Sequence, residues 1–370
     1  MSDGFQLALS ALAVGYAITI SITPVTSRLA RRFNIMDHPA TDLAGYKKHA
    51  NSIPYLGGVA IFFGTIAGSL FLLAAAEETT AASVDRWAIA VAIGVGLALI
   101  GMFDDIQHLP RSLRAGTQVG AAVGAWFAGF QINATPYLWL NLFIMIVWTV
   151  GITNAFNLLD NMDGLSAGLA GVAAVTFAVM GIVEGQPALA IVGAALGGSV
   201  LGFLVHNRHP ARAFMGDAGS LFIGFMLAII GIKLQFNNLV SVTFLVPLVV
   251  LGLPIFDTTL VVISRLRHKR AVFLGGRDHV SHRLVQIGLP VRNAVGSLYF
   301  SALCLGWLGL SISRANPQVG FMLLGFVLAV GAFVGLLLSR VPVYAEEVEA
   351  IAALEDEQEE SKVTYLETKA

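Results

Sequence analysis

Charged residues are scarce in this chain of 370 residues, and cysteine is nearly absent. Only 12% of the residues are Asp, Glu, Lys or Arg, whereas 56% are apolar. Soluble domains carry roughly a quarter of charged residues, so this composition excludes a soluble globular domain. The single cysteine, Cys304, excludes an intramolecular disulfide. The composition therefore indicates an integral membrane protein.

Long stretches without any Asp, Glu, Lys or Arg divide the chain. They cover residues 4–27, 49–76, 87–103, 115–159, 164–183, 185–205, 218–232, 234–256, 293–313 and 315–339. Most suit one span of ~20 residues, and the run 115–159 suits two because the polar, proline-containing segment Gln131–Tyr137 interrupts it. Apolar runs without alternation exclude a β-barrel. We expect an all-α integral membrane protein with about eleven transmembrane helices in residues 1–344 and an acidic cytoplasmic tail over 345–370.

Lysine and arginine are distributed unequally between the two sides of the predicted topology. If the N-terminus lies outside, 19 of the 22 Lys and Arg residues fall in inner segments, and the outer segments hold only Arg86, Lys233 and Arg314. The positive-inside rule then predicts an outer N-terminus and a cytoplasmic C-terminus. No basic nucleic-acid-binding pattern is present, so we expect no nucleic-acid partner.

Aspartates mark the inner ends of three predicted spans: Asp104 and Asp105, Asp160 and Asp163, and Asp217. Each one alone is explained by a helix cap. Together, however, they would repel one another unless a cation lay among them. Mg²⁺ takes oxygen ligands and commonly combines one or two carboxylates with substrate phosphates, whereas zinc would need a Cys/His ligand frame that this sequence lacks. We expect the cytoplasmic loops to form the active site.

The stretch FNLLDNMDGL, residues 156–165, has polar residues at three-residue steps. If this stretch starts or ends a helix, Asn157, Asp160 and Asp163 share one face. That face would offer an amide and two carboxylates to a nucleotide or a metal. A glycine-terminated helix end at Gly164 explains the same pattern without any ligand.

Three further inner loops contain candidate ligands. In FMGDAGS, Asp217 can bind a metal or cap a helix, and Phe214 can stack on a base or simply pack. In RDHVSHR, imidazole and cationic groups suit phosphate recognition or proton transfer; the candidates are Asp278, His279, His282 and Arg283. Lys48 suits either a membrane anchor or a phosphate ligand, and the basic run 265–270 is explained as a membrane anchor.

Five motifs in sequence order resemble the polyprenyl-phosphate N-acetylhexosamine-1-phosphate transferase superfamily, glycosyltransferase family 4. The resemblance runs from about residue 31 to residue 284, and the motifs read KKHANSIPYLGG, FDDI, NAFNLLDNMDGLSAG, NRHPARAFMGDAGSLFIG and GGRDHVSHRL. The resemblance implies transfer of GlcNAc-1-phosphate, or of another N-acetylhexosamine-1-phosphate, from a UDP-sugar to undecaprenyl or another polyprenyl phosphate. UMP would be released in this first membrane step of cell-envelope glycan synthesis. It also implies a bacterial plasma membrane location and Mg²⁺, with Mn²⁺ as a substitute, and it leaves a homodimer open.

The resemblance, together with the chemistry of the residues, predicts a role for each candidate. The catalytic set would be Asp104, Asp105, Asp160, His279 and His282. The substrate-binding set would be Lys48, Asn157, Asp163, Phe214 and Arg283, with Phe214 at the uracil. The metal ligands would be Asp217, Asp105 and Asp160.

One departure from the family pattern lies in the last motif. The sugar-transferring branch commonly has H-x-H-H, whereas this chain has Ser281 where the middle histidine would stand. The chain also lacks the GTPTMGG form and the consecutive histidines of the related phospho-MurNAc-pentapeptide translocase, so the N-acetylhexosamine branch fits better. The motifs are compatible with a direct attack by the lipid phosphate and with a covalent aspartyl intermediate.

A secondary transporter is the competing interpretation from another functional class. Transporters place ionisable residues near the bilayer midplane, on interrupted helices. Here the charge-free runs leave the midplane nearly empty of charge. This distribution favours the enzyme.

Overall fold

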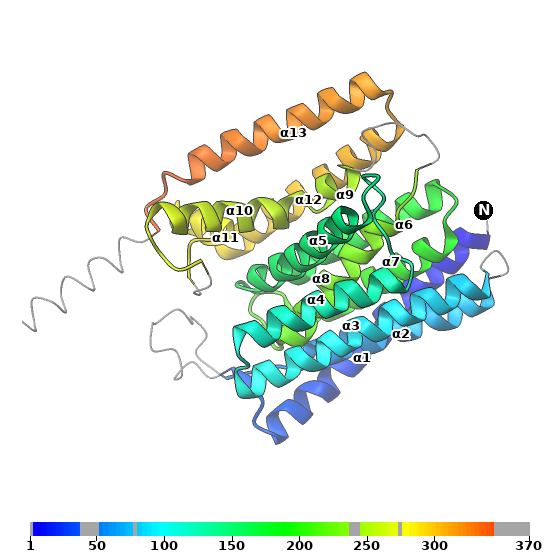
Figure 1. Ribbon diagram of the computed structural model, residues 1–370. Coiled ribbons are helices and arrows are strands. Elements are labelled where there is room, and N and C mark those ends of the chain that lie inside the picture. Colours follow the sequence, from blue (N-terminus) through cyan, green and yellow to red (C-terminus); the bar gives the residue numbers. More distant parts are fainter. Residues whose placement is uncertain (1–2, 38–51, 77–79, 237–244, 273–275, 344–370) are drawn as a thin grey trace, which may run out of the picture.

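The computed structural model describes residues 3–37, 52–76, 80–236, 245–272 and 276–343, and it is almost entirely helical (Figure 1). The described α-helices, in chain order, are α1 (Asp3–Arg32), α2 (Gly57–Ala75), α3 (Ala81–Gln107), α4 (Arg111–Phe127), α5 (Leu138–Leu159), α6 (Leu165–Val183), α7 (Pro187–Asn207), α8 (Gly216–Lys233), α9 (Val246–Val250), α10 (Gly252–Arg267), α11 (Val280–Gln286), α12 (Val291–Arg314) and α13 (Pro317–Leu338). Two short strands, β1 (Met36–Asp37) and β2 (Ile53–Pro54), pair antiparallel with Met36 opposite Pro54. Residues 345–370, the predicted tail, lie outside the described residues.

The predicted all-α membrane architecture is confirmed. Among the described residues, nine helices are long and apolar enough to cross a bilayer. The remaining two predicted spans correspond to α4, which has 17 residues, and to the consecutive helices α9 and α10. The expected break inside the run 115–159 lies between Phe127 and Leu138. The total of eleven spans and the orientation stay predictions.

The position of the span predicted at 234–256 differs from that of the helices observed there. Helices α9 and α10 together reach from Val246 to Arg267, so the helical segment continues past the charge-free run and includes Asp257. The Asp257 carboxylate is buried and accepts hydrogen bonds from the His279 ring and from the Val280 backbone N–H. Because a paired carboxylate is tolerated inside a helix bundle, this charge does not mark a helix end.

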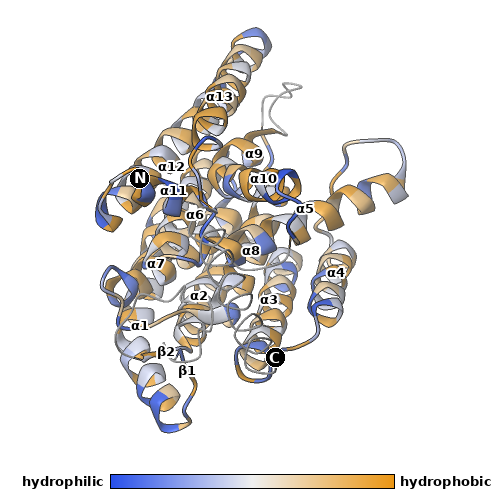
Figure 2. Cartoon of the chain, turned by 90° about the vertical axis from the view of Figure 1, so that its left-hand side faces the viewer, coloured by the Kyte–Doolittle hydropathy of each residue, from blue (hydrophilic) through white to orange (hydrophobic). Residues whose placement is uncertain are grey.

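Helices α7 and α8 form the centre of the bundle. In the most apolar 18-residue stretch of each helix, 78% of the residues of α7 and 83% of those of α8 are buried. The corresponding share is 6% in α13, which lies at the edge of the bundle (Figure 1). Hydrophobic residues cover most helix surfaces, while hydrophilic residues gather at helix ends and loops (Figure 2). In a bilayer the apolar side chains of α13 contact lipid, so they need no protein cover.

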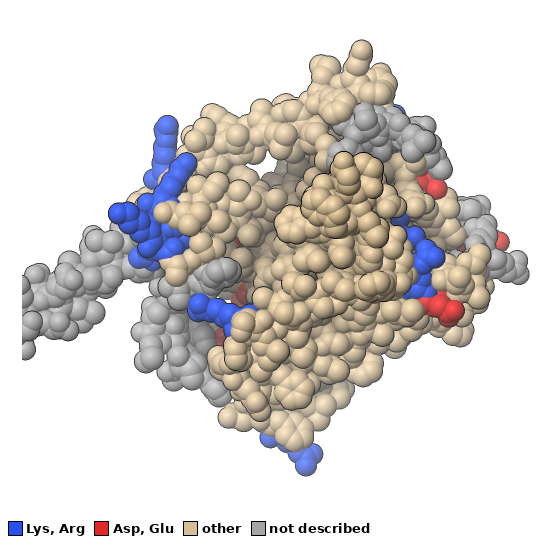
Figure 3. Space-filling view, viewed as in Figure 1, with Lys and Arg blue, Asp and Glu red and all other residues tan. Residues whose placement is uncertain are grey.

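The loops that carry the sequence motifs meet at one end of the bundle. A broad, nearly uncharged band separates the charged ends of the molecule in the space-filling view, and acidic residues are visible within a recess at the end where Lys and Arg gather (Figure 3). Hydrogen bonds between these loops join the segments around residues 55, 105, 157, 163 and 214. This end contains the candidate active site.

Candidate active site

The last turn of α3 presents the aspartate pair. Helix α3 ends at Gln107, and the next residue, His108, has a φ of 50° that breaks the helical backbone. The Leu109 backbone N–H then donates to Asp104 Oδ1 at 2.6 Å. The other oxygen of Asp104 pairs with Arg114 Nη1 at 2.7 Å, and the Asp104 side chain is buried. Both oxygens of Asp104 are therefore occupied by protein donors.

Arg114, in the first turn of α4, links three elements of the site. Besides Asp104 on α3, its Nη2 lies 3.1 Å from Asp217 Oδ2 on α8 and donates to Asn157 Oδ1 on α5 at 3.3 Å. The planar guanidinium has several donors in a fixed fork, which suits simultaneous binding to several oxygens. In the sequence, Arg114 counts only among the basic residues of the inner segments. It follows Asp104 by ten residues and a turn, and this spacing does not predict a contact between the two side chains.

Asp105 and Asp217 meet where α3 approaches the start of α8. The Asp217 backbone N–H donates to Asp105 Oδ1 at 3.0 Å. Gly216 has a φ of +67°, and a Cβ built there would lie 2.3 Å from Asp105 Oδ2. On the other side of the contact, a Cβ on Gly101 would lie 2.5 Å from the Asp217 carbonyl. Two glycines thus allow the backbones to approach closely enough to bring these carboxylates together.

Asn157 and Asp160 complete the cluster from the end of α5. Asn157 Nδ2 donates to Asp217 Oδ1 at 2.7 Å and to Ser220 Oγ at 3.0 Å. Asp160 follows the last residue of α5, and burial, together with the negative charges of Asp217 and Asp163, raises the pKa of Asp160 to about 7. We call the four carboxylates of Asp104, Asp105, Asp160 and Asp217 the acidic cluster. Arg114 pairs with two of them, Asp104 and Asp217.

Asp163 does not share a helix face with Asn157 and Asp160, because α5 ends at Leu159. Its Oδ2 instead accepts hydrogen bonds from His209 Nδ1 at 2.8 Å and from the Ala211 backbone N–H at 3.0 Å. Asp163 thereby holds the loop between α7 and α8. The three-residue spacing did not predict this outcome, since it cannot show where a helix stops.

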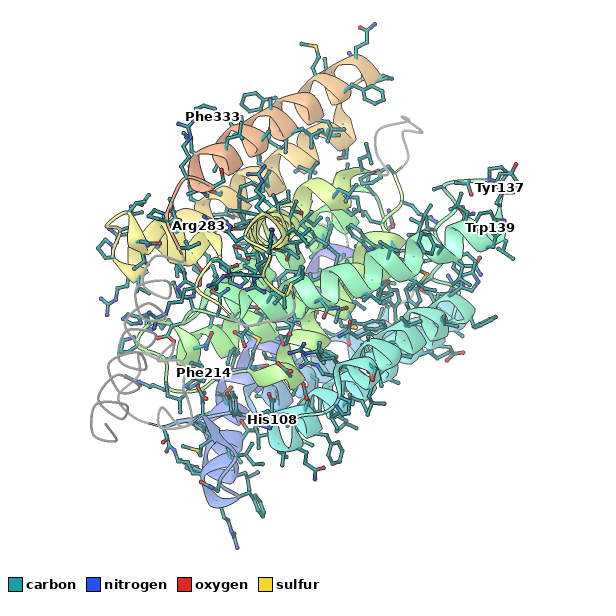
Figure 4. All side chains as sticks on the ribbon, turned by 60° about the vertical axis from the view of Figure 1, so that its left-hand side comes forward. His108, Tyr137, Trp139, Phe214, Arg283 and Phe333 are labelled. Atoms are coloured by element: carbon teal, nitrogen blue, oxygen red, sulfur yellow. The ribbon has the colours of Figure 1, made fainter. Side chains whose placement is uncertain are left out.

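Asn207 and Phe214 fix the two ends of that loop. Asn207 accepts from Gly164 N at 3.0 Å and donates to the Ala213 carbonyl at 3.0 Å. The backbone of Phe214 bonds to Pro54 and Gly57, at the start of α2, and the half-buried Phe214 ring lies at the same end of the molecule as His108 (Figure 4). Sequence reasoning missed Asn207 and His209, although both are polar residues at the end of a span.

The histidine motif is anchored by a buried acid. His279 Nδ1 lies 2.7 Å from Asp257 Oδ2, and the ring centroids of His279 and His282 lie 6.4 Å apart. Ser281, the residue in place of a histidine, lies in α11 and donates to Asn161 Oδ1 at 2.9 Å, so it connects α11 to the segment that follows α5. Asp257 therefore fixes which nitrogen of His279 is turned away from it.

Arg283 was expected to bind substrate and Arg265 to anchor the chain at the membrane surface, but both side chains bond to other parts of the protein. Arg283 is fully buried and donates to the carbonyls of Asp278 and Leu338 at 2.8 Å. Arg265, expected at the membrane surface, makes a buried bidentate pair with Asp278 at 2.7 and 2.8 Å. Because the Arg283 guanidinium is enclosed by protein acceptors, its predicted contact with substrate is not retained. Lys48 lies outside the described residues.

The donor set fits a magnesium ion with few protein ligands. Asp105 Oδ2 is buried without a hydrogen-bond partner, and its neighbours are carboxylates. Within the described part of the chain, no three His, Cys, Asp or Glu side chains already form a complete metal cage. The residues that could hold Mg²⁺ here are carboxylates, the oxygen ligands that this ion takes, and water and substrate phosphates would have to supply the rest of its coordination.

Comparison with known proteins agrees with these motifs. The family model described as glycosyl transferase family 4 matches residues 87–235, a range that holds all four residues of the acidic cluster. The chain is 32% identical over 299 residues, covering 78% of this chain and 80% of the relative, to the "Probable undecaprenyl-phosphate N-acetylglucosaminyl 1-phosphate transferase" of Bacillus subtilis.

Two further relatives have similar overlap. Identity is 30% over 378 residues, or 92% of this chain and 91% of the relative, to the decaprenyl-phosphate N-acetylglucosaminephosphotransferase of Mycolicibacterium smegmatis. The chain is also 30% identical over 332 residues, covering 81% of this chain and 94% of the relative, to the phospho-N-acetylmuramoyl-pentapeptide-transferase of Desulforamulus reducens. All three relatives carry names of phosphosugar transferases.

Proposed function

Because this chain belongs to glycosyl transferase family 4, we propose that it transfers GlcNAc-1-phosphate from UDP-GlcNAc to undecaprenyl phosphate or another polyprenyl phosphate. The products are UMP and a polyprenyl-diphosphate GlcNAc, made at the cytoplasmic face of a bacterial plasma membrane. The observation that carries this proposal is the acidic cluster at one end of an apolar bundle, with Arg114 between Asp104 and Asp217. A soluble nucleotide sugar and a lipid headgroup can both reach such a place.

Asp217, Asp105 and Asp160 are the residues that would hold Mg²⁺. Asp105 Oδ2 is buried without a hydrogen-bond partner, and burial together with the negative charges of Asp217 and Asp163 raises the pKa of Asp160. A cation bound among these carboxylates would offset their mutual repulsion. When bound, the ion supplies neutralisation of the phosphate charges, which is worth several kcal/mol in phosphoryl transfer. Phosphoryl transfer otherwise depends on positioning and electrostatics, which are the work of the protein side chains.

Arg114 and Asn157 would position the diphosphate of the nucleotide. Arg114 carries a fork of donors at the centre of the site, and Asn157 fixes Asp217 through its amide. Asp104 would hold Arg114 rather than take a proton from the lipid phosphate, since both its oxygens already accept hydrogen bonds or ion pairs. Asp105 is the acid of the pair with a free oxygen, so it is our candidate to orient the lipid phosphate for a direct, in-line attack.

His279, His282 and Phe214 would complete the substrate site. The Asp257 carboxylate keeps the proton of neutral His279 on Nδ1, which leaves Nε2 as an acceptor or, when protonated, a donor toward a phosphate. Phe214 would stack on the uracil. Lys48, by resemblance, would contact the phosphates.

The test is UMP release by detergent-purified protein given UDP-GlcNAc, undecaprenyl phosphate and Mg²⁺, with each omitted in turn. We expect release only when all three are present, loss on chelation with EDTA, and recovery with Mg²⁺ or Mn²⁺. Release with a different UDP-N-acetylhexosamine alone would correct the sugar. No release with any of them, from protein shown to be folded, would contradict the transferase and favour the transporter, and a sugar-phosphate adduct on an aspartate would contradict direct attack.

A further inference from the structure

Tyr55 lies between the strand pair and the loop that carries Phe214. It follows β2 and precedes α2, and the backbone on both sides of it bonds to Phe214. The Phe214 N–H donates to the Pro54 carbonyl at 2.9 Å, and Gly57 N–H donates to the Phe214 carbonyl at 3.0 Å. The main chain of Phe214 is therefore held by the segment that contains Tyr55.

The two aromatic side chains also contact each other. The ring centroids of Tyr55 and Phe214 lie 6.2 Å apart, with 44° between the ring planes. This spacing is within the range of favourable tilted aromatic pairs, which have centroids roughly 4.5–7 Å apart. The Tyr55 ring thus restricts the orientations open to the Phe214 ring.

The hydroxyl of Tyr55 is itself fixed by a buried acid. It hydrogen-bonds to Asp37, which is 7% exposed and is held by the β1–β2 pairing opposite Ile53. Burial and the negative charge of Asp37 raise the pKa of Tyr55, so the phenol stays protonated and donates its hydrogen. Tyr55 lies at the same end of the molecule as the acidic cluster, because Phe214, with which its ring pairs, precedes Asp217 by three residues. The charges of Asp105 and Asp160 contribute to the raised pKa of Tyr55.

We propose that Tyr55 is a positioning residue for nucleotide recognition: anchored by Asp37, it holds the Phe214 ring in the orientation that stacks on the uracil. This inference rests on the proposed function, because it needs a UDP-sugar as substrate. Tyr55 belongs to the stretch IPYLGG, residues 53–58, and nothing in the sequence predicts that its ring contacts Phe214. Tyr55 acts through Phe214 and makes no chemical step of its own.

The first test compares Tyr55→Leu with Tyr55→Phe. Tyr55→Leu removes the ring, and we expect KM for UDP-GlcNAc to rise about two- to tenfold, the change that corresponds to an aromatic pair worth ~0.5–1.5 kcal/mol. Tyr55→Phe keeps the ring and loses only the bond to Asp37, so its KM should rise less. Neither variant should change KM for undecaprenyl phosphate, and kcat at saturating substrates should remain close to that of the unaltered protein.

A double-mutant cycle with Phe214→Leu separates positioning from general damage. If Tyr55 acts through Phe214, adding Tyr55→Leu to Phe214→Leu should leave KM for UDP-GlcNAc where Phe214→Leu alone puts it. Additive effects would overturn the proposal, as would equal changes in kcat and in both KM values. An unchanged KM in Tyr55→Leu or in Phe214→Leu would also overturn it.

Tyr137→Leu is a matched control. Tyr137 pairs with Trp139 at a similar separation of 6.3 Å and an angle of 37°, but this pair lies far from Phe214 in the molecule (Figure 4). We expect this variant to leave both KM values unchanged. A failure of the proposed function itself would look different, because the unaltered protein would then release no UMP.

Discussion

Each carboxylate of the acidic cluster has a different environment, and this difference separates their roles. Both oxygens of Asp104 are engaged by protein donors, whereas Asp105 keeps one buried oxygen without a partner. Asp217 lies between Arg114 and Asn157. The two residues of the DD pair look equivalent in the sequence. They differ in the structure because protein donors reach both oxygens of Asp104 but only one oxygen of Asp105.

At this scale, we expect Asp217→Asn to abolish most activity while preserving the fold. The substitution keeps the size of the side chain and an oxygen that can accept from Asn157, but it removes the charge proposed to bind Mg²⁺. Loss of several kcal/mol of charge stabilisation corresponds to a fall in kcat of about a hundredfold or more. The measurement is UMP release under saturating substrates, with a parallel titration of Mg²⁺.

Asp85→Asn is the control for this prediction. Asp85 is exposed near the beginning of α3, at the opposite end of that helix from Asp104. The activity of the Asp85→Asn variant and its dependence on Mg²⁺ should match those of the unaltered protein. Activity in Asp217→Asn within a few-fold of normal would remove Asp217 from the proposed metal ligands.

At the scale of the elements, the site depends on how closely α3 and α8 approach. A Cβ on Gly101 would lie 2.5 Å from the backbone of Asp217, so no side chain fits between these helices without moving one of them. We expect Gly101→Ala to lower kcat by about tenfold or more, since displacements near 1 Å can reduce rates a hundredfold. The assay is again UMP release, together with the Tm of the purified variant.

Gly96→Ala provides a control on the same helix. A Cβ at Gly96 meets nothing within 4 Å, so the backbone can accept it without displacement. Both substitutions replace glycine by alanine within α3 and therefore share any gain in helix propensity. If Gly96→Ala lost as much activity as Gly101→Ala, the close approach would not explain the loss.

Arg283 connects α11 to the end of α13. Its guanidinium donates to carbonyls at Asp278, Leu338 and Val341, so removing it leaves buried acceptors without donors. We expect Arg283→Met to lower the Tm by about 5 °C or more, because breaking a buried charged network costs ~3–5 kcal/mol. KM for UDP-GlcNAc should stay unchanged in the folded fraction.

The comparison for Arg283 is Arg292→Met, which alters an exposed arginine in the first turn of α12. The Tm of this variant should stay within about 1 °C of the normal value, as is usual for surface changes. A normal Tm in Arg283→Met combined with a raised KM would restore the substrate-binding role expected from the sequence.

For the whole molecule, the arrangement predicts which end faces the cytoplasm. The acidic cluster and Arg111 lie at one end, and Tyr137 lies at the other. The distribution of Lys and Arg predicts that the end with the cluster faces the cytoplasm. In a Cys304→Ser background, Tyr137→Cys should react with a membrane-impermeant maleimide in intact cells, whereas Arg111→Cys should react only after permeabilisation. The reverse pattern would contradict the predicted orientation.

The sequence by itself determined the class of fold, and it predicted which aspartates would lie together. Long charge-free runs are sufficient to predict spanning helices, because lipid admits few other structures. The sequence also predicts the break at Gln131–Tyr137, because polar residues and proline interrupt an apolar helix locally. Asp104, Asp105, Asp160 and Asp217 were expected at one site, and the structure brings them together there.

Only the tertiary structure decided which partner each polar residue has. Arg114 bridges three helices, and Asp257 anchors His279 from inside α10. Arg283, which the motif assigned to substrate, is instead enclosed by the protein. These contacts join residues far apart in the sequence, and a local pattern cannot report them because the distance between two side chains is set by how the helices pack. The helix periodicity could place Asp163 beside Asn157 only if the helix continued to Asp163, but α5 ends at Leu159.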